Sequence, residues 1–184
     1  MKTLFIGGIK SGKSLLAEQY ILSQRPKTKD QRPYYLATTE FTDDEITQRI
    51  EIHQKRRAND FITIEEPLDL VKQVSLLEQP VLIECTTMWI NNMLYHNQTK
   101  EQILEHIETL MQLDRNIVIV HNDVGSGIIP DNALAREYVD ISGIVSQIIA
   151  AQCDEVYHCI AGIATRIKGE EERVKKKGGM VNGK

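Results

Sequence analysis

The chain has 184 residues, a length typical of a single domain with its own hydrophobic core. Aromatic residues make up 5% of the chain and hydrophobic residues 41%, so aliphatic side chains carry the core, as in α/β proteins. The net charge is −4, but residues 166–184 hold seven Lys or Arg and three Glu, so the preceding body carries −8. A body this acidic argues against a nucleic-acid binder, because such binding depends on neutralising phosphates.

Short apolar runs alternate along the chain with longer segments of helical character. The runs predicted as strands are 4–6, 34–37, 61–64, 81–83, 117–120 and 155–157, and the segments predicted as helices are 13–24, 43–57, 67–77, 87–112 (one helix or two) and 131–152. The near-continuous apolarity of the strands indicates a sheet buried on both faces and therefore mostly parallel. We expect a three-layer α/β fold, with residues 1–168 as one domain.

Two polar segments differ from this pattern. Residues 25–33 are rich in Pro, Lys and Arg and are predicted to form a surface loop. The charged tail, residues 169–184, is predicted to be a short exposed helix or a frayed end. Its three lysines stand beside three glutamates, so the run is weak evidence for a nucleic-acid or membrane surface.

The cysteines and the hydropathy pattern predict a cytoplasmic protein without a membrane span. Cys85, Cys153 and Cys159 have no CxxC spacing, and an odd number of cysteines suits a reducing compartment. We expect each of them to be a small buried apolar residue. No apolar run reaches the roughly 18 residues that a membrane-spanning helix needs.

A phosphate-binding loop is the strongest motif of the sequence. It follows the first strand, opens the first helix and fits the pattern Gly, four residues, Gly-Lys-Ser, with the residues Gly7, Gly8, Ile9, Lys10, Ser11, Gly12, Lys13 and Ser14. In such a loop the backbone N–H groups and the helix N-terminus surround phosphate oxygens. Lys13 would contact the β- and γ-phosphates, and Ser14 would be a ligand of Mg²⁺. We predict a nucleotide-binding protein that takes GTP or ATP.

An acidic residue ends the strand predicted at 81–83. A bound Mg²⁺–triphosphate favours a carboxylate at such a position, and Glu84 supplies one. The alternative is an ordinary carboxylate at a strand end.

A histidine among arginines marks the helix predicted at 43–57. Arg49, His53 and Arg57 lie at intervals of four residues and therefore share a face, with Arg56 beside them. Nearby cations favour the neutral, nucleophilic imidazole, and arginines can hold phosphate. His53 would then attack phosphorus and form a phosphoramidate. From spacing alone, a solvated basic helix face is the better interpretation.

Residues 122–130 follow the strand predicted at 117–120, at the edge where parallel sheets place ligands. They form either a tight loop near substrate or a plain strand-to-helix turn. On the next helix, Arg136 and Asp140 are spaced for a surface ion pair.

Taken together, the motifs resemble one family, the bifunctional adenosylcobinamide kinase/adenosylcobinamide-phosphate guanylyltransferases of cobalamin assembly. The resemblance spans about residues 3–168, and its motifs lie in family order at 7–14, 35–38, 43–46, 49–57, 63–67, 82–89, 122–130 and 134–140. Three positions depart from the family's usual residues: Lys10 replaces Arg, Asp123 replaces Glu and His121 replaces a small residue. We expect His121 to be a packed or surface histidine and no new catalytic group.

The resemblance implies a RecA-like P-loop fold, a homotrimer and a two-step reaction. Adenosylcobinamide would first be phosphorylated, and GTP would then guanylylate His53, which passes GMP to the corrinoid phosphate. The catalytic residues would be His53 and Lys13, and Mg²⁺ would be held by Ser14 and Glu84. Beyond the P-loop, the resemblance implies nucleotide contacts at Ala37, Thr38, Thr39, Gln54, Lys55, Arg56, Arg57, Glu65 and Glu84.

Two other functions fit a P-loop chain. One is a kinase acting on another small metabolite, and the other is a non-catalytic GTP-binding protein. The sequence has no recognisable Asn-Lys-x-Asp motif, which regulatory GTPases use to read guanine, and this counts against the second alternative.

Overall fold

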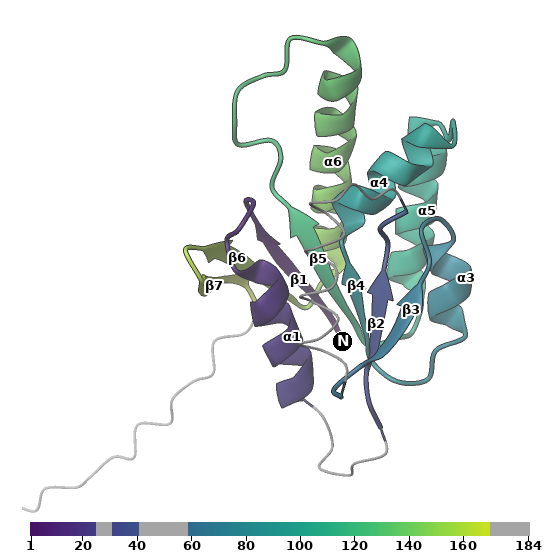
Figure 1. Ribbon diagram of the computed structural model, residues 1–184, viewed down its shortest axis with the longest axis vertical. Helices are drawn as coiled ribbons and strands as arrows, with labels where there is room; N and C mark the ends of the chain where they lie inside the picture. Colours follow the sequence, from purple (N-terminus) through teal and green to yellow (C-terminus); the bar gives the residue numbers. More distant parts are fainter. Residues whose placement is uncertain (25–30, 41–58, 170–184) are drawn as a thin grey trace, which may run out of the picture.

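The strands of this computed structural model, which describes residues 1–24, 31–40 and 59–169, form one seven-stranded sheet (Figure 1). Its order is β3-β2-β4-β5-β1-β6-β7. Every neighbouring pair is parallel except β6 and β7, which are antiparallel. The strands are β1 (Lys2–Gly7), β2 (Tyr34–Ala37), β3 (Ile62–Glu65), β4 (Val81–Glu84), β5 (Ile117–Asn122), β6 (Glu155–Ile160) and β7 (Ile163–Lys168).

Helices cover both faces of the sheet. The described helices are α1 (Lys13–Ser23), α3 (Leu70–Ser75), α4 (Thr86–Tyr95), α5 (Lys100–Gln112) and α6 (Ala133–Gln152). Helix α1 lies against β1, β4 and β5 on one face, whereas α4 and α6 pack on the other and α3 and α5 join them (Figure 1). The expected three-layer, mostly parallel α/β fold is confirmed.

The two cores follow from the alternation of side chains along each strand. Leu4, Leu36 and Ile83 point to the face covered by α3, α4, α5 and α6. Their neighbours Phe5 and Leu82 point to the opposite face, where α1 packs. Each of these side chains is at most 2% exposed. The prediction of a sheet buried on both faces is therefore correct for the central strands.

Two predicted helical segments have different bounds in the structure. The segment 87–112 forms two helices, because the chain ends α4 at Tyr95 and starts α5 behind a capping box. In that box Thr99 accepts from the backbone N–H of Gln102, and the side chain of Gln102 accepts from the backbone N–H of Thr99. The segment 67–77 shortens to α3, which begins behind the N-cap Asp69.

One strand was missed by the sequence reading, which ended the sheet at 155–157. The strand β6 extends to Ile160 and turns back through Ala161 and Gly162 into β7. Both turn residues have positive φ, +52° and +82°, as a two-residue type I′ hairpin turn requires. The strand β7 lies at the edge of the sheet and most of its side chains are exposed, so it lacks the apolar run of a buried strand.

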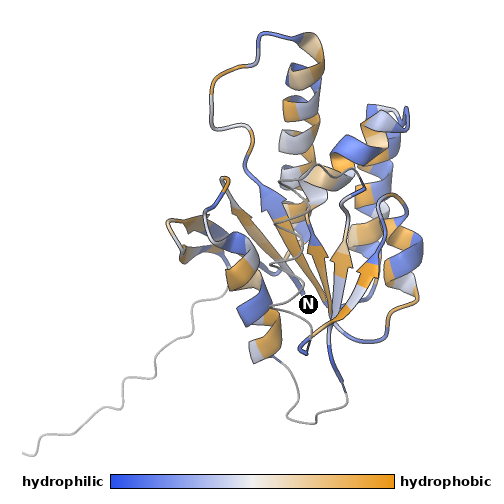
Figure 2. Ribbon diagram, in the orientation of Figure 1, coloured by the Kyte–Doolittle hydropathy of each residue, from blue (hydrophilic) through white to orange (hydrophobic). Residues whose placement is uncertain are grey.

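The parallel strands end at one edge of the sheet, which carries most of the predicted site. The P-loop, Thr38, Glu65, Glu84 and Asp123 all follow or end strands at this edge. Figure 2 shows apolar residues concentrated in the central strands, and a further apolar stretch in the connection between β5 and α6. No helix in the described part of the chain is long and apolar enough to cross a bilayer. The predicted helix 43–57, part of the loop 25–33 and nearly all of the tail lie outside the described residues.

Candidate functional site: a phosphate-binding edge

The P-loop connects β1 to α1 through a tight turn. The backbone N–H of Ser11 donates to the carbonyl of Gly8 at 3.2 Å, and that of Leu16 donates to Gly12 at 3.0 Å as the first turn of α1 forms. Gly12 caps the helix with φ of +90°, a conformation that costs an L side chain about 1–2 kcal/mol. The loop thus directs the N-terminus of α1 toward the open edge, where its dipole favours anions.

Close packing also requires the glycines of the loop. A Cβ on Gly7 would lie 2.3 Å from the carbonyl oxygen of Cys159, and one on Gly12 would lie 3.0 Å from the Cα of Gly162. The backbone N–H of Gly162 donates to the carbonyl of Ser11 at 2.8 Å. The turn of the β6–β7 hairpin therefore packs directly against the P-loop and donates a hydrogen bond to it. Sequence reasoning missed this role of Gly162, although an Ala-Gly pair between two runs of strand-forming residues is a signal for a turn.

Lys13 is held inside the loop. Its side chain is 7% exposed, and its Nζ donates to the carbonyl of Gly8 at 3.1 Å. A backbone carbonyl of the loop therefore fixes the position of the ammonium group. A phosphate bound there would meet a fixed positive charge together with backbone N–H groups.

Ser14 and Glu84 lie in direct contact, although 70 positions separate them. The hydroxyl of Ser14 donates to Oε1 of Glu84 at 2.6 Å. The first residues of α1 and the end of β4 therefore meet across β5, and the structure brings together the two residues predicted to hold Mg²⁺. A carboxylate and a hydroxyl are oxygen donors, which Mg²⁺ prefers and to which nucleotide phosphates add. The pair fits such an ion.

Thr38 fixes the backbone that carries Glu84. It is fully buried, and its hydroxyl donates to the carbonyls of Glu84 and Cys85 at 3.1 and 2.9 Å while it accepts from the N–H of Cys85 at 3.0 Å. Its own N–H donates to the main-chain carbonyl of Glu84 at 2.9 Å. In this conformation Thr38 fixes the end of β4. Of the other predicted contacts, Ala37 and Thr39 are half-buried and Glu65 is exposed at the end of β3.

Asn92 is a structural residue of the site that sequence reasoning missed. It is fully buried on α4, and its Nδ2 donates to the carbonyls of Thr38 and Pro67 at 2.6 and 3.1 Å. It therefore ties the segment after β2, which carries the predicted nucleotide contacts Thr38 and Thr39, to the segment after β3. A polar residue within the apolar face of a helix is the signal that would have identified it.

A buried polar network lies behind the end of β5. His121 is 1% exposed, and its two ring nitrogens pair with the hydroxyls of Thr86 and Ser142 at 2.8 and 3.1 Å. Burial lowers the pKa of His121 to about 4; the charge of Asp123 opposes this shift, whereas that of Lys13 adds to it. The ring is therefore neutral at neutral pH and packed between α4 and α6, as expected for a non-catalytic histidine.

The segment after β5 leaves the sheet as an exposed connection to α6 (Figure 1). Asp123 begins it, and its backbone N–H donates to the carbonyl of Gly7 at 2.9 Å. This contact favours the first interpretation of residues 122–130, a loop beside the site. Arg136 donates to the carbonyls of Pro130 and Asp131 at 2.9 and 2.8 Å and so fastens the loop to α6, in place of the expected pairing with Asp140.

The three cysteines are free and buried, as predicted. Burial raises the pKa of the Cys85 thiol, and the neighbouring charge of Glu84 raises it further. Burial also raises the pKa of Cys153, to about 12, and that of Cys159. These thiols are therefore protonated and poorly nucleophilic, although Cys85 directly follows the site residue Glu84.

The predicted covalent residue and its neighbours lie outside the described residues. These are Arg49, His53, Gln54, Lys55, Arg56 and Arg57. They adjoin the site in the chain, because the segment that contains them follows Glu40 and precedes β3. Glu40 is itself paired with His96 at the end of α4, at 2.9 Å.

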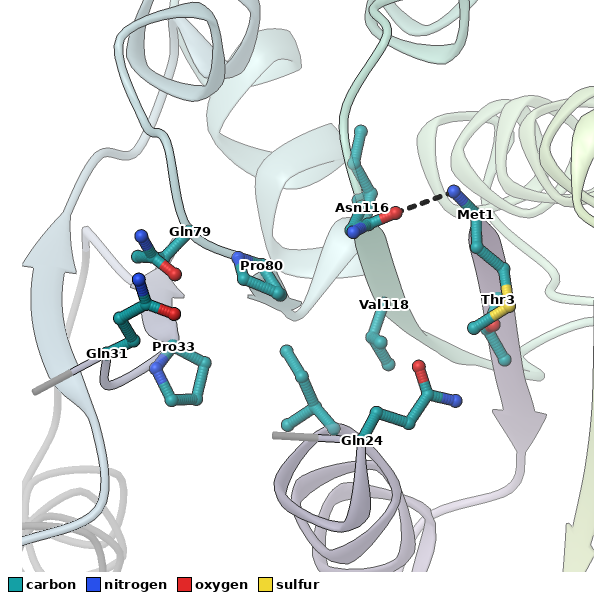
Figure 3. A pocket seen from close by; sticks show the side chains of 11 residues that line it. Met1, Thr3, Gln24, Gln31, Pro33, Gln79, Pro80, Asn116 and Val118 are labelled. Carbon is teal, nitrogen blue, oxygen red and sulfur yellow. Dashed lines mark hydrogen bonds between the residues drawn. The ribbon is translucent and has the colours of Figure 1, made fainter. Parts of the chain in front are cut away.

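A small cavity of about 70 Å³ lies at the opposite edge of the sheet, near the strand starts (Figure 3). Gln24, Pro33, Pro80 and Asn116 line it, and Asn116 accepts from the N-terminal ammonium group of Met1 (Figure 3). It is far too small for a nucleotide and has none of the predicted site residues. The P-loop edge remains the candidate site.

Comparisons with known proteins agree on one family. A family model described as cobinamide kinase / cobinamide phosphate guanyltransferase matches residues 3–167. The chain is 34% identical to the bifunctional adenosylcobalamin biosynthesis protein CobP of Pseudomonas aeruginosa, over 92% of this chain and 99% of that protein. It is 32% identical to the bifunctional adenosylcobalamin biosynthesis protein CobU of Escherichia coli, over 91% of this chain and all of that protein.

A solved structure of a Pyrococcus horikoshii protein shares the fold. The TM-score is 0.50 at 11% sequence identity, and the match covers 93% of this chain and 87% of that one.

Proposed function

Because this chain belongs to the cobinamide kinase / cobinamide phosphate guanyltransferase family, we propose that it phosphorylates adenosylcobinamide and then transfers GMP from GTP to the product, giving adenosyl-GDP-cobinamide. The observation that carries this proposal is the P-loop edge, where Lys13, Ser14 and Glu84 come together within a family match that runs through almost the whole chain. ATP or GTP serves the first reaction and GTP the second.

In the kinase reaction the P-loop holds the triphosphate. Backbone N–H groups of residues 8–14 and the N-terminus of α1 face the phosphate oxygens, and Lys13 neutralises charge on the phosphoryl group as it is transferred. The acceptor is the aminopropanol hydroxyl of adenosylcobinamide. Preorganisation supports this role, because Lys13 is already held over the loop by Gly8 and needs little rearrangement when the nucleotide binds.

In the guanylyl reaction His53 is the covalent carrier. A neutral imidazole nitrogen attacks the α-phosphorus of GTP, pyrophosphate leaves, and GMP then passes from His53 to a phosphate oxygen of the corrinoid. The sequence supports this step through Arg49, Arg56 and Arg57, whose charges favour a neutral ring and offset charge on the phosphoryl group. We propose Ala37, Thr38, Thr39, Gln54, Lys55 and Glu65 as further nucleotide contacts.

We propose Mg²⁺ as the metal of this site, held by Ser14 and Glu84 together with the nucleotide phosphates. The 2.6 Å contact between the hydroxyl and the carboxylate supports this, because it places two oxygen donors side by side at the P-loop. The ion would supply charge neutralisation of the phosphates.

We further propose that residues 1–168 act as one cytoplasmic domain that assembles into a homotrimer. The free cysteines agree with a reducing compartment. Exposed aliphatic side chains support assembly, because Ile128 is 97% exposed and Ile129 81% exposed on the connection between β5 and α6.

Covalent labelling tests the central chemistry. The full chain is incubated with Mg²⁺ and GTP labelled at the α-phosphorus, beside a His53→Ala variant. We expect label on the native chain that is lost in acid and stable in alkali, as a phosphoramidate is, and none on the variant. A native chain that phosphorylates adenosylcobinamide but takes no label is a kinase alone. A chain that does neither contradicts the proposed function.

A further inference from the structure

The residue that follows β5 is fixed to the P-loop. Strand β5 lies between β1, which leads into the P-loop, and β4, which ends at Glu84 (Figure 1). Its last residue, Asn122, pairs with Gly7, and the next residue, Asp123, donates its backbone N–H to the carbonyl of Gly7 at 2.9 Å. Asp123 is therefore placed at the phosphate-binding edge by main-chain contacts, independently of its side chain.

The side chain of Asp123 is oriented by its own loop. One carboxylate oxygen accepts from the backbone N–H of Gly125 at 3.3 Å, and the other accepts from the hydroxyl of Ser126. The residue is half-buried, whereas Gly125 and Ser126 are exposed, so the carboxylate stands at the open side of the site.

The two carboxylates beside the P-loop have different partners. Glu84 accepts from Ser14, the residue proposed to hold the metal. Asp123 forms no ion pair within residues 1–24, 31–40 and 59–169, and its partners are a neutral N–H and a neutral hydroxyl. A carboxylate that is oriented but not neutralised by a cation can accept a proton. An acceptor hydroxyl must lose its proton when it attacks phosphorus, so such a carboxylate can act as its base.

We propose that Asp123 is the general base of the kinase reaction. The acceptor hydroxyl oxygen forms a bond to the γ-phosphorus, and its proton passes to the carboxylate of Asp123. The bond between the γ-phosphorus and the oxygen that bridges it to the β-phosphorus breaks, and its electron pair leaves with the nucleoside diphosphate. This inference rests on the proposed function.

The guanylyl reaction has no need of this base. Its nucleophiles are a neutral imidazole nitrogen and a phosphate oxygen, and neither attacks as a hydroxyl group that must lose a proton. Loss of Asp123 should therefore slow the kinase reaction alone. A residue with a purely structural role would instead affect both reactions when it is replaced.

The test compares Asp123→Asn and Asp123→Glu with the native chain in two assays. The first follows phosphorylation of adenosylcobinamide, and the second follows GMP transfer from GTP to adenosylcobinamide phosphate supplied ready-made. For Asp123→Asn we expect the kinase kcat to fall roughly 10²–10⁴-fold, as loss of a general base does, with the KM for the nucleotide within about threefold. The GMP transfer rate should be unchanged, which also shows that the variant is folded.

Two further variants sharpen the result. Asp123→Glu keeps a carboxylate and should retain much more kinase activity than Asp123→Asn. Asp131→Asn removes one negative charge from an exposed position of the same connection and should leave both rates unchanged. Kinase activity that survives in Asp123→Asn would overturn the inference, as would equal losses in both assays. A native chain without kinase activity would instead contradict the proposed function, and the inference would fall with it.

Discussion

At the scale of single residues, the site is organised by side chains that fix backbone and charge before any nucleotide arrives. Thr38 holds the end of β4, Lys13 is held by Gly8, and Ser14 is paired with Glu84. The contacts of Thr38 and Ser14 join elements that are distant in the chain, and that of Lys13 lies within the P-loop, so the edge is preorganised by the fold itself. Preorganised donors stabilise developing charge without a cost of reorganisation at the moment of reaction.

His121 makes the stability of the protein depend on pH. Burial lowers its pKa from 6.5 to about 4, so the unfolded chain binds a proton more readily than the folded chain between these values. The stabilisation is complete above pH 6.5 and is lost as the pH falls toward 4. The full shift corresponds to a contribution on the order of 3 kcal/mol.

Urea unfolding at pH 7, 5.5 and 4.5 measures this contribution. The variant His121→Asn should be less stable at pH 7, because the pairings with Thr86 and Ser142 are disturbed, but it should lose less stability on acidification than the native chain. His158→Asn, at a half-buried position within β6, is the control substitution at a second histidine. Equal pH slopes for the native chain and His121→Asn would contradict this account.

Some of these residues could be predicted from the sequence and others could not. The P-loop follows a local pattern of eight residues, and Glu84 follows an apolar run, so both were found by reading along the chain. The roles of Gly162 and Asn92 depend on contacts with residues about 150 and 54 positions away, Ser11 and Thr38. A local pattern can mark such a residue as unusual, but its partner is defined only once the sheet order is fixed.

At the scale of elements, buried strands and long helices were predicted well because their apolar periodicity is strong. The six predicted strands all exist, and β3 begins one residue later than expected. The hairpin strand β7 was missed because it is an exposed edge strand with polar residues such as Thr165, Arg166 and Lys168. Its turn, Ala161-Gly162, also lacks the Asn-Gly or Asp-Gly signature that favours type I′.

That turn yields a stabilising prediction. Ala161 has φ of +52°, a conformation that Asn and Gly adopt at lower cost than Ala does. Replacing Ala161 with Asn should raise the free energy of unfolding by about 0.5–1 kcal/mol. Chemical denaturation measures the change, and Ala164→Asn, within β7, is the control that should give no gain. A loss of stability in Ala161→Asn would contradict the assigned turn geometry.

At the scale of the whole molecule, the sheet gathers the chemistry at one edge and leaves apolar surface elsewhere. Ile128 and Ile129 are exposed on the segment leading into α6, Leu134 is exposed in the first turn of that helix, and Ile160, Ile163 and Ile167 are exposed on the β6–β7 hairpin. Figure 2 shows the first of these apolar stretches standing clear of the sheet. Exposed aliphatic groups in this number are typical of surfaces that another chain covers.

The proposed trimer accounts for these surfaces and is measured directly by light scattering after size-exclusion chromatography. The native chain should elute with about three times the 21.0 kDa mass of one chain. The double variant Ile128→Ser, Ile129→Ser should shift toward the monomer, whereas Leu76→Ser, at an exposed aliphatic position after α3, should leave the mass unchanged. A monomeric native chain at micromolar concentration would contradict the proposal.

We propose that the P-loop holds the triphosphate in both reactions. This is the central claim of the account, and the most direct measurement is the rate of each reaction in the variant Lys13→Ala. Kinase activity and GMP transfer are followed separately, with the unfolding midpoint as the control for folding. The account predicts that both rates fall by roughly 10²–10³-fold, because the same fixed charge faces the phosphates in each. Either reaction proceeding at the native rate in a folded Lys13→Ala chain would contradict the claim and would require a second nucleotide site.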